Sequence, residues 1–371
     1  MKRIFSLILA MVLMLTLAAC GGPEIQDKKE THIIVDHAGY EVEVPLEVDR
    51  VAVCSILPLP SVLAVFFDSA EKIVGMASGS KSAAENSLLG QLYPELLEAE
   101  TAFIEGGSIN VEELMKLAPD VVFYNTAEAE VGEQLRNAGF CAVAVSVNKW
   151  DYDAMETLRN WISLLGEIFP ENDKEKTVAE YSQAMYELVQ SRVADIPEKE
   201  RVFFLYKYSD TAIMTSGGKF FGQWWADAIG AVNVGQEMTT DNSVTVNMEQ
   251  IYEWNPSMIF ITNFTTAYPD DLYGSTVGNY DWSPVDAVKG ERVYKMPLGM
   301  YRSYTPGVDT PITLLWLAKT AYPMQFADID IVDETRKYYK EVFGIDLTAD
   351  QAASIFAPAA EVGAGFKEVI P

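Results

Sequence analysis

Basic residues, histidine and cysteine are all scarce in this chain of 371 residues. The sequence has 27 lysines and arginines against 54 aspartates and glutamates, a net charge of −27, together with two histidines and three cysteines. Three cysteines are too few for a disulfide scaffold. A surface this acidic is repelled by phosphate backbones, so we expect no nucleic-acid partner.

The scarcity of histidine also narrows the chemistry. His32 and His37 both precede the first expected core strand, where we expect a structural role. Bare zinc and manganese sites normally use imidazole, and Ser-His-Asp catalysis requires it, so we expect neither. The chain also lacks a Gly-x4-Gly-Lys phosphate loop. Cys54 and Cys141 lie in apolar runs, and we expect two buried hydrophobes rather than a bridge.

The N-terminus has the features of an export signal. Lys2 and Arg3 precede a short apolar run at residues 7–17 that is too short to span a bilayer comfortably. Leu-Ala-Ala before Cys20 resembles the lipobox of bacterial lipoproteins, in which the cysteine sulfur takes a diacylglycerol; an ordinary secretory signal with a chance cysteine is the alternative. We expect a signal peptide at 1–20, lipid attachment at Cys20 and a flexible tether at 21–31.

Apolar residues, by contrast, are abundant and make up 49% of the chain. A mature chain of this length is too large for a single hydrophobic core, so we expect two domains or lobes. A short strand pair is expected at 33–35 and 40–45. After it, Val-rich runs typical of strands buried on both faces alternate with helix-length segments. These runs are 50–56, 73–77, 121–124 and 142–147. A second α/β series follows, with strands expected at 201–208, 258–263 and 292–296.

A long helix is expected between the two series, at residues 172–196, bounded by Pro170 and Pro197. Further helices begin near Pro311 and cover 333–343 and 348–356. The sequence thus predicts an α/β fold of two Rossmann-like lobes with largely parallel sheets, joined by one long α-helix. The expected parts are an N-terminal lobe at 32–170, a connecting helix at 171–197, and a C-terminal lobe with the terminal helices at 198–371.

An internal repeat gives the sharpest structural signal. A segment that starts at Asn110 recurs from Asn247, with every matching position offset by 137 and no gap. Each copy has an asparagine at the expected N-cap, a short helix, a proline stop at Pro119 or Pro256, and a buried strand. The match indicates two lobes of like construction.

Both copies place a glutamate at the second helical position, Glu112 and Glu249. Glu113 and Gln250 follow, where they can fold back on the cap amide as in a capping box. Interaction with the partial charge of the helix N-terminus, worth about 0.3–1 kcal/mol, would by itself explain both glutamates. The alternative is functional: helix N-termini fed by the carboxyl ends of strands lie on the ligand side of open α/β sheets.

Five short stretches occur in a fixed order: 35–45 with 50–53, 110–122, 220–234, 249–256, and 315–326. Together they resemble the substrate-binding lipoproteins of ABC importers for iron-siderophores, haem and cobalamin, whose lobes are joined by one long helix. The resemblance covers nearly the whole mature chain. It implies that Glu112 and Glu249 form salt bridges with arginines on the two permease subunits. One departure is Ser257, where the family usually has Asp after the proline.

We expect ligand contacts from the loops that follow the strands. Arg302, between Tyr301 and Tyr304, has the geometry to grip a carboxylate or another anion with two hydrogen bonds; a surface arginine stacked on tyrosine is the alternative. Trp225 and Trp316 lie on helical faces and are expected to be packing residues. The full expected set is Ser55, Leu57, Ser78, Tyr124, Asn125, Lys149, Trp150, Tyr206, Lys207, Tyr208, Lys219, Trp224, Asn263, Tyr301 and Arg302.

These features lead to one functional hypothesis. A monomer, held by its lipid anchor alone on the outer face of the cytoplasmic membrane, captures a metal chelate, foremost a ferric siderophore. It delivers this ligand to an ABC permease dimer with its ATPase. Cobalamin, haem or an oxyanion such as molybdate are alternatives in the same class, and an exported carboxylate-dependent hydrolase is the alternative from another class. We expect no catalytic residues, no cofactor and no direct metal ligand.

Overall fold

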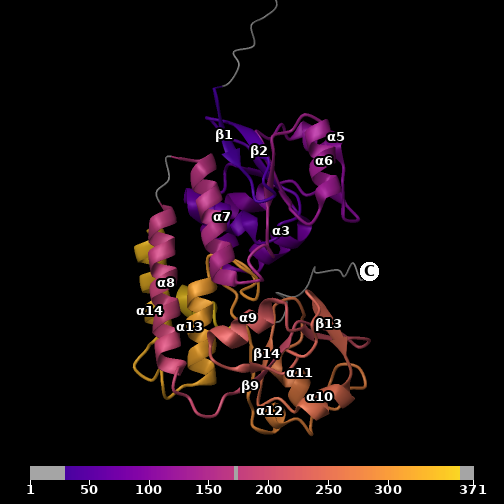
Figure 1. Ribbon diagram of the computed structural model, residues 1–371, viewed down its shortest axis with the longest axis vertical. Coiled ribbons are helices and arrows are strands. Elements are labelled where there is room, and N and C mark those ends of the chain that lie inside the picture. Colours follow the sequence, from indigo (N-terminus) through magenta and orange to yellow (C-terminus); the bar gives the residue numbers. More distant parts are fainter. Residues whose placement is uncertain (1–29, 171–173, 360–371) are drawn as a thin grey trace, which may run out of the picture.

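Two parallel sheets form the centres of the two lobes. The computed structural model describes residues 30–170 and 174–359, and within them each lobe has one four-stranded parallel sheet (Figure 1). The first sheet has the order β4-β3-β7-β8, with β3 at Val51–Val53, β4 at Ile73–Met76, β7 at Val121–Asn125 and β8 at Ala142–Val145. The second has the order β12-β9-β14-β15, with β9 at Arg201–Leu205, β12 at Val232–Asn233, β14 at Met258–Ile261 and β15 at Val293–Lys295.

The two sheets share one topology. Numbered along its own lobe, each sheet has the strand order 2-1-3-4. The internal repeat falls on the third strand of each sheet, β7 and β14, and on the helices that precede them, α5 at Val111–Lys116 and α10 at Met248–Trp254. The predicted α/β fold with two lobes of like construction is therefore confirmed.

Side chains along each strand alternate between the two faces of the sheet, and both faces are buried. In β7, Val121 and Phe123 belong to one buried cluster while Val122 and Tyr124 belong to another. In β14, Met258 and Phe260 again face one cluster, and Ile259 and Ile261 face the other. Parallel strands buried on both faces are nearly continuous in apolar residues, which is the pattern that revealed them in the sequence.

Helices cover these faces. The first lobe has α2 at Leu59–Phe67, α3 at Ser78–Glu85, α4 at Leu88–Leu92, the short 3₁₀ helix η1 at Pro94–Glu98, α5, α6 at Ala129–Asn137 and α7 at Ala154–Ile168. The second has α9 at Phe221–Ala228, α10, α11 at Pro269–Tyr273 and α12 at Asp286–Lys289.

The predicted connecting helix is α8, at Lys174–Val193. It bridges the two cores because Val178 packs in the first lobe's core, whereas Met185 and Val189 pack in the second's. At about 1.5 Å per residue its 20 residues reach roughly 30 Å. It packs beside α7 and α13 (Thr310–Ala321) along the edge of the molecule that lies on the left in Figure 1.

The last helices pack differently from the expected grouping with the second lobe. Residues of α14 (Ile331–Tyr338) and of the π-helical turn η2 (Tyr339–Phe343) belong to the first lobe's core, together with Ala352 from α15 (Ala349–Ser354). After α13, most of which packs in the second lobe's core, the chain thus contributes again to the first lobe's core, to which Met300, Val308 and Ile312 also belong. The expected boundaries near 170 and 197 stay predictions.

Antiparallel pairs add to this frame. The hairpin of β1 (Thr31–Val35) and β2 (Glu41–Pro45) matches the expected strand pair. The expected strand 201–208 is interrupted at Tyr206, and its end forms β10 (Lys207–Tyr208) in a separate sheet with β11 (Ile213–Ser216) and β13 (Ser243–Val246). The short pair β5 (Ile104–Glu105) and β6 (Ser108–Ile109) was likewise not expected from the sequence.

Several N-terminal expectations concern residues that the structure does not describe. The signal peptide at 1–20, lipid attachment at Cys20 and nearly all of the 21–31 tether lie outside the described residues. Within residues 30–170 and 174–359, every helix is too short or too polar to cross a bilayer.

Cys54, Cys141 and His37, which belong to the residue types that are scarce in this chain, have structural roles in the first lobe. Cys54 is a buried free thiol and Cys141 a half-buried one, and burial raises their pKa values to about 12 and about 11. The Nδ1 atom of His37 accepts a hydrogen bond from the backbone N–H of Ser146 at 3.1 Å. Burial, and then the nearby charge of Lys149, lower the pKa of His37 to about 4.

This pKa predicts an acid-sensitive contribution to stability. An unfolded histidine has a pKa of about 6.5, so between pH 6.5 and 4 the unfolded chain takes up a proton that folded His37 refuses. The free energy of unfolding should therefore fall as the pH falls through this window. His37→Asn keeps a hydrogen-bond acceptor without a titrating group, so urea denaturation from pH 4 to 7.5 should show a shallower pH dependence for the variant. Equal slopes would contradict the assignment.

Candidate functional site

Arg302 is a buried charge at the contact between the lobes. It lies in the loop between β15 and α13 and is fully buried. Its Nη1 atom is 3.3 Å from the Tyr301 hydroxyl and 3.4 Å from the carbonyl oxygen of Gly79, in α3 of the first lobe. The guanidinium carbon is also 5.2 Å from the ring centre of Phe264. We call Gly79, Phe264, Tyr301 and Arg302 the inter-lobe cation site.

A buried carboxylate shapes the loop that presents Arg302. One oxygen of Asp309 accepts the backbone N–H groups of Met300 at 2.7 Å and Tyr301 at 3.3 Å, and the other accepts the hydroxyl of Tyr339 from the terminal helices. Gly299 is required here because an added Cβ would lie 2.0 Å from Asp309 Oδ1. Burial raises the pKa of Asp309 to about 6, although these hydrogen bonds oppose the shift.

A second buried cation fixes the neighbouring loop. The Nζ atom of Lys295 donates to the carbonyls of Thr262, Thr265 and Ala267 at 3.0, 2.7 and 2.8 Å. Burial, with the positive charge of Arg302 as a lesser cause, lowers the pKa of Lys295 to about 7. Three hydrogen bonds from one ammonium hold the segment 262–267, which carries Phe264 against Arg302.

Aromatic side chains form the wall of the site in the second lobe. The ring of Tyr206 lies 5.2 Å from Phe264, 5.4 Å from Tyr304 and 5.6 Å from Phe220. Burial raises the pKa of Tyr206 and of Tyr301, so both phenols are neutral at physiological pH, although the nearby charge of Arg302 opposes the shift. The site therefore combines a cation with neutral hydroxyl groups in an otherwise acidic chain.

The structure brings several of the expected ligand residues to this contact. Asn263 is buried and donates to the carbonyls of Met296 at 2.9 Å and Pro297 at 2.8 Å. Leu57 is half-buried against Gly79 and the second lobe's core. The expected residues that lie at or beside the inter-lobe cation site are Leu57, Ser78, Tyr206, Asn263, Tyr301 and Arg302.

Other expected residues lie elsewhere. Tyr124 packs on the far face of the first sheet, where its hydroxyl accepts from Arg136 at 2.8 Å. Tyr208 belongs to the far core of the second lobe and accepts from the indole of Trp282 at 2.9 Å. Both point away because the side chains of a strand alternate between faces.

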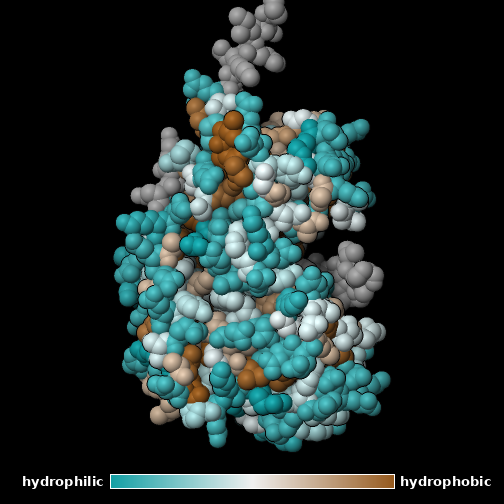
Figure 2. Space-filling model, in the orientation of Figure 1, coloured by the Kyte–Doolittle hydropathy of each residue, from teal (hydrophilic) through white to brown (hydrophobic). Residues whose placement is uncertain are grey.

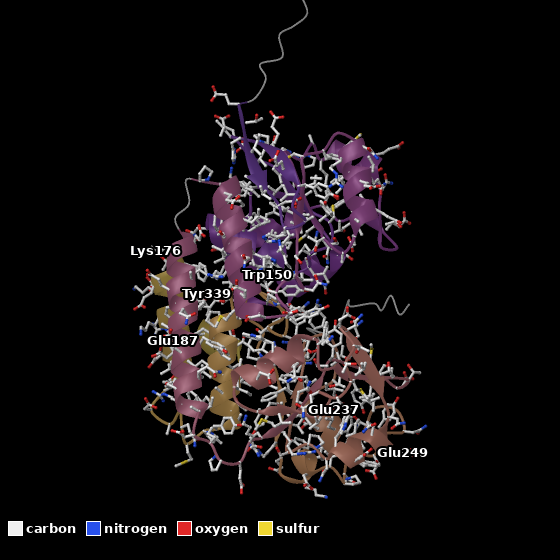
Figure 3. All side chains as sticks on the ribbon, viewed as in Figure 1. Trp150, Lys176, Glu187, Glu237, Glu249 and Tyr339 are labelled. Carbon is white, nitrogen blue, oxygen red and sulfur yellow. The ribbon has the colours of Figure 1, made fainter. Side chains whose placement is uncertain are left out.

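The remaining expected residues are distributed along the loops. Ser55 Oγ accepts the N–H of Asn125 at 3.1 Å, and Lys149 donates to the carbonyl of His37 at 3.0 Å. Trp150, at mid-height in Figure 3, packs edge-on against His37 at 5.0 Å. Lys207 lies 5.7 Å from the ring of Tyr206, Lys219 is exposed, and Trp224 packs against Trp225 at 4.6 Å. Ligand contacts for all of these stay predictions, whereas Trp225 and Trp316 are packing residues as expected.

The two glutamates of the repeat are exposed on corresponding helices. Asn110 caps α5 by accepting from the N–H groups of Glu112 and Glu113, and Asn247 caps α10 by accepting from Gln250. The expected capping box is replaced by other pairs, because Glu113 binds Lys116 and Gln250 binds Glu253. Both helices lie on the right in Figure 1, the side on which Figure 2 shows a notch between the lobes.

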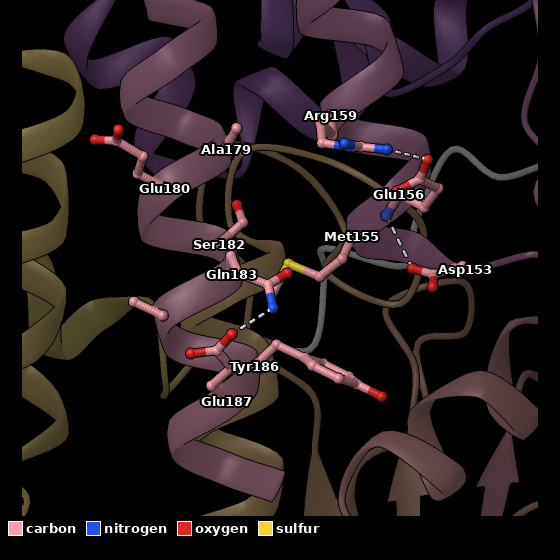
Figure 4. Close-up of a pocket in the computed structure, with 11 residues that line it drawn as sticks. Asp153, Met155, Glu156, Arg159, Ala179, Glu180, Ser182, Gln183, Tyr186 and Glu187 are labelled. Atoms are coloured by element: carbon pink, nitrogen blue, oxygen red, sulfur yellow. Dashed lines mark hydrogen bonds and ion pairs between the residues drawn. The ribbon is translucent and has the colours of Figure 1, made fainter.

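A separate groove of about 760 Å³ runs between α7 and α8 (Figure 4). Its acidic side chains already have partners, since Glu156 binds Arg159 and Glu187 accepts from Gln183 at 2.7 Å. We therefore treat it as the surface of the connecting helices. Among the described residues, no group of three or more His, Cys, Asp or Glu side chains is arranged to hold a metal ion, and the expectation about metal ligation stays a prediction.

Sequence reasoning missed Gly79, Phe264, Lys295 and Asp309. Lys295 carried a usable signal because it is a lone charge inside the largely apolar stretch 293–301, and Asp309 did so as the lone charge just before the apolar helix that starts near Pro311. An isolated charge in a buried segment must find hydrogen-bonding partners. Gly79 and Phe264 carried none, because their role depends on the approach of the two lobes.

Comparison with known proteins places this geometry in context. The family model described as periplasmic binding protein matches residues 75–298. The molybdate-binding protein MolA of Haemophilus influenzae is 27% identical over 341 residues, which cover 86% of this chain and 93% of that protein. Its molybdate-bound crystal structure superposes with a TM-score of 0.70 at 25% identity, over 85% of this chain and 99% of that one.

A periplasmic solute-binding protein from Veillonella parvula is 28% identical with a TM-score of 0.79, over 88% of this chain and 97% of that one. The Helicobacter pylori protein CeuE, solved with nickel and histidine, has a TM-score of 0.69 at 21% identity over 88% and 99% of the two chains, which shows a common fold. The match to the family model confirms the resemblance found in the sequence. The chain therefore belongs to the periplasmic binding protein family, and like its relatives it is an extracytoplasmic solute-binding protein of ABC transport rather than an enzyme.

Proposed function

We propose that this protein captures a small oxyanion, such as molybdate, between its lobes and delivers it to an ABC permease. The observation that carries the proposal is the complete burial of Arg302 where the two lobes meet. A guanidinium binds oxyanions through two parallel charge-assisted hydrogen bonds, and burial strengthens them because water does not compete.

Neighbouring groups support an anion at this point. Helix α3 begins at Ser78, beside Gly79 and Arg302, and backbone N–H groups at a helix start favour negative charge. Lys295 lies close enough to Arg302 for the charge of Arg302 to help lower the pKa of Lys295 to about 7, so Lys295 adds a partial positive charge at neutral pH. The molybdate-binding relative supports the same ligand class.

A metal chelate, foremost a ferric siderophore, remains the second candidate. The aromatic wall of Tyr206, Phe220, Phe264 and Tyr304 favours it, because such rings suit a bulky ligand. An iron(3+)-hydroxamate-binding protein of Bacillus subtilis, 21% identical over 208 residues, belongs to the same group of relatives. The compact burial of the inter-lobe cation site favours the smaller anion.

The ligand must then be delivered to the permease. Glu112 and Glu249 are exposed residues of α5 and α10, one helix on each lobe, and both helices lie on the notch side of the molecule. There the glutamates would pair with arginines of the two permease subunits. A lipid on Cys20 would hold the monomer at the outer face of the cytoplasmic membrane, within reach of the permease.

Replacing Arg302 should weaken anion capture. Loss of a charge-assisted hydrogen bond weakens binding by about 1.5–3 kcal/mol, or roughly 10- to 100-fold. We expect Arg302→Gln to raise the Kd for molybdate by at least this factor and Arg302→Lys to lose less. Isothermal titration with molybdate, tungstate, sulfate and a ferric hydroxamate measures this. Arg192→Gln is the control, because Arg192, on α8, pairs with Asp328 of the loop before α14, away from the site. Preferential hydroxamate binding, or unchanged molybdate binding by Arg302→Gln, would favour the chelate.

Reversing the two exposed glutamates should separate delivery from capture. We expect Glu112→Lys with Glu249→Lys to abolish ligand uptake in cells that express the cognate permease, while the purified variant binds ligand as the wild type does. The matched control reverses Glu180 and Glu187, two exposed residues of α8, and Figure 3 shows Glu187 on the opposite side of the molecule from Glu249. Normal uptake by the Glu112 and Glu249 variant would refute docking through these residues.

A further inference from the structure

The segment between β8 and α7 reaches from the first lobe into the second. The ring of Tyr152 packs edge-on against Phe220 at 5.2 Å and Phe221 at 4.8 Å, at the start of α9. Its hydroxyl donates to the carbonyl of Asp241 at 2.7 Å. All three partners belong to the second lobe, whereas β8 belongs to the sheet of the first.

The backbone of this segment is strained. Asp151 and Tyr152 have φ values of +50° and +59°, so two consecutive residues with side chains occupy the left-handed region. Few residues other than glycine adopt this conformation, and a bulky side chain there persists only where surrounding contacts hold it. The contacts that hold Tyr152 include those with the second lobe and a side-chain hydrogen bond with Asn148 in its own segment.

The next residue fixes the end of the segment. Asp153 caps α7 by accepting the N–H of Glu156 at 2.8 Å, and it also forms a hydrogen bond with the side chain of Trp224 in α9. The segment 151–153 is thus bound to the second lobe at two successive side chains.

A continuous row of rings connects this segment to the inter-lobe cation site. Phe220, which contacts Tyr152, lies 5.6 Å from Tyr206, which in turn lies 5.2 Å from Phe264. Phe264 is one of the two rings that the guanidinium of Arg302 lies over, Tyr301 being the other. The lobes therefore meet at both ends of one packed row, at Tyr152 and at Arg302.

We propose that Tyr152 is a latch that holds the lobes closed over the bound ligand and so sets the rate at which the ligand leaves. The strain at Asp151 and Tyr152 opposes the latch, which keeps closure reversible. Tyr152 is a positioning residue that does not touch the ligand. For the ligand itself, this inference rests on the proposed function.

Two pairs of variants test the latch and the strain, with molybdate as the probe. Tyr152→Ala should raise the dissociation rate about tenfold, since it removes two aromatic contacts and a hydrogen bond while leaving Arg302 in place. The matched control is Tyr252→Ala, because the Tyr252 hydroxyl also donates to an aspartate carbonyl, at 2.6 Å, but within one lobe. Tyr152→Phe, which keeps the ring, should show a smaller increase and serves if Tyr152→Ala does not fold.

Asp151→Gly should relieve strain in the closed state and slow dissociation several-fold. Glu291→Gly is its control, because Glu291 is also an exposed acidic residue, with a φ of +54°, but lies outside the latch. Dissociation rates that match the wild type in both Tyr152 variants would overturn the latch. If Asp151→Gly raises the melting temperature, as Glu291→Gly would, but leaves the dissociation rate unchanged, the role of strain is overturned.

A readout without ligand separates this inference from the proposed function. Small-angle X-ray scattering of the ligand-free proteins should give a larger radius of gyration for Tyr152→Ala than for the wild type and Tyr252→Ala. If the wild type binds no molybdate, the proposed function fails. The latch is then tested by the radii alone. Equal radii of gyration for Tyr152→Ala and the wild type would overturn it, and a larger radius for Tyr152→Ala would support it.

Discussion

The site depends on one costly arrangement, a guanidinium buried where two lobes touch. A charge removed from water is tolerated only when nearby groups replace its hydration. Around Arg302 these groups include a backbone carbonyl from the first lobe, the hydroxyl of Tyr301 and the faces of two rings. Because one of these partners, the carbonyl of Gly79, comes from the other lobe, the charge has its full set of partners only while the lobes are together. A ligand anion in the same place would bind both lobes for the same reason.

The fold positions the groups that surround Arg302. In both lobes the chain leaves the carboxyl end of a parallel strand and enters the contact: β4 leads to α3 with Gly79, β14 leads to Asn263 and Phe264, and β15 leads to the Arg302 loop. Sheets of the same topology thus turn their ligand edges toward each other. Lys295 and Asp309 then hold the loops, and the hydroxyl of Tyr339 connects Asp309 to the terminal helices that pack on the first lobe.

Much of the fold can be predicted from the sequence because local sequence patterns determine it. Buried parallel strands are apolar throughout, the asparagine caps recur at a fixed offset, and Arg302 stood out as a cation between tyrosines in an acidic chain. The contact itself was not predictable, since Gly79 and Arg302 are 223 positions apart and meet only through the approach of the lobes. The directions of Tyr124 and Tyr208, which point away from the inter-lobe cation site, were not predictable either, because one residue of strand register decides which face a side chain takes. The return of α14 and η2 to the first lobe has no local signal either, since aromatic residues suit either core.

The most direct test of the account is a crystal structure of the protein with molybdate, in which anomalous scattering locates the metal without reference to the protein atoms. The account predicts one strong peak between the lobes, with oxygen atoms within hydrogen-bonding distance of the Arg302 guanidinium. A peak in the groove between α7 and α8, or none between the lobes at saturating molybdate, would contradict it.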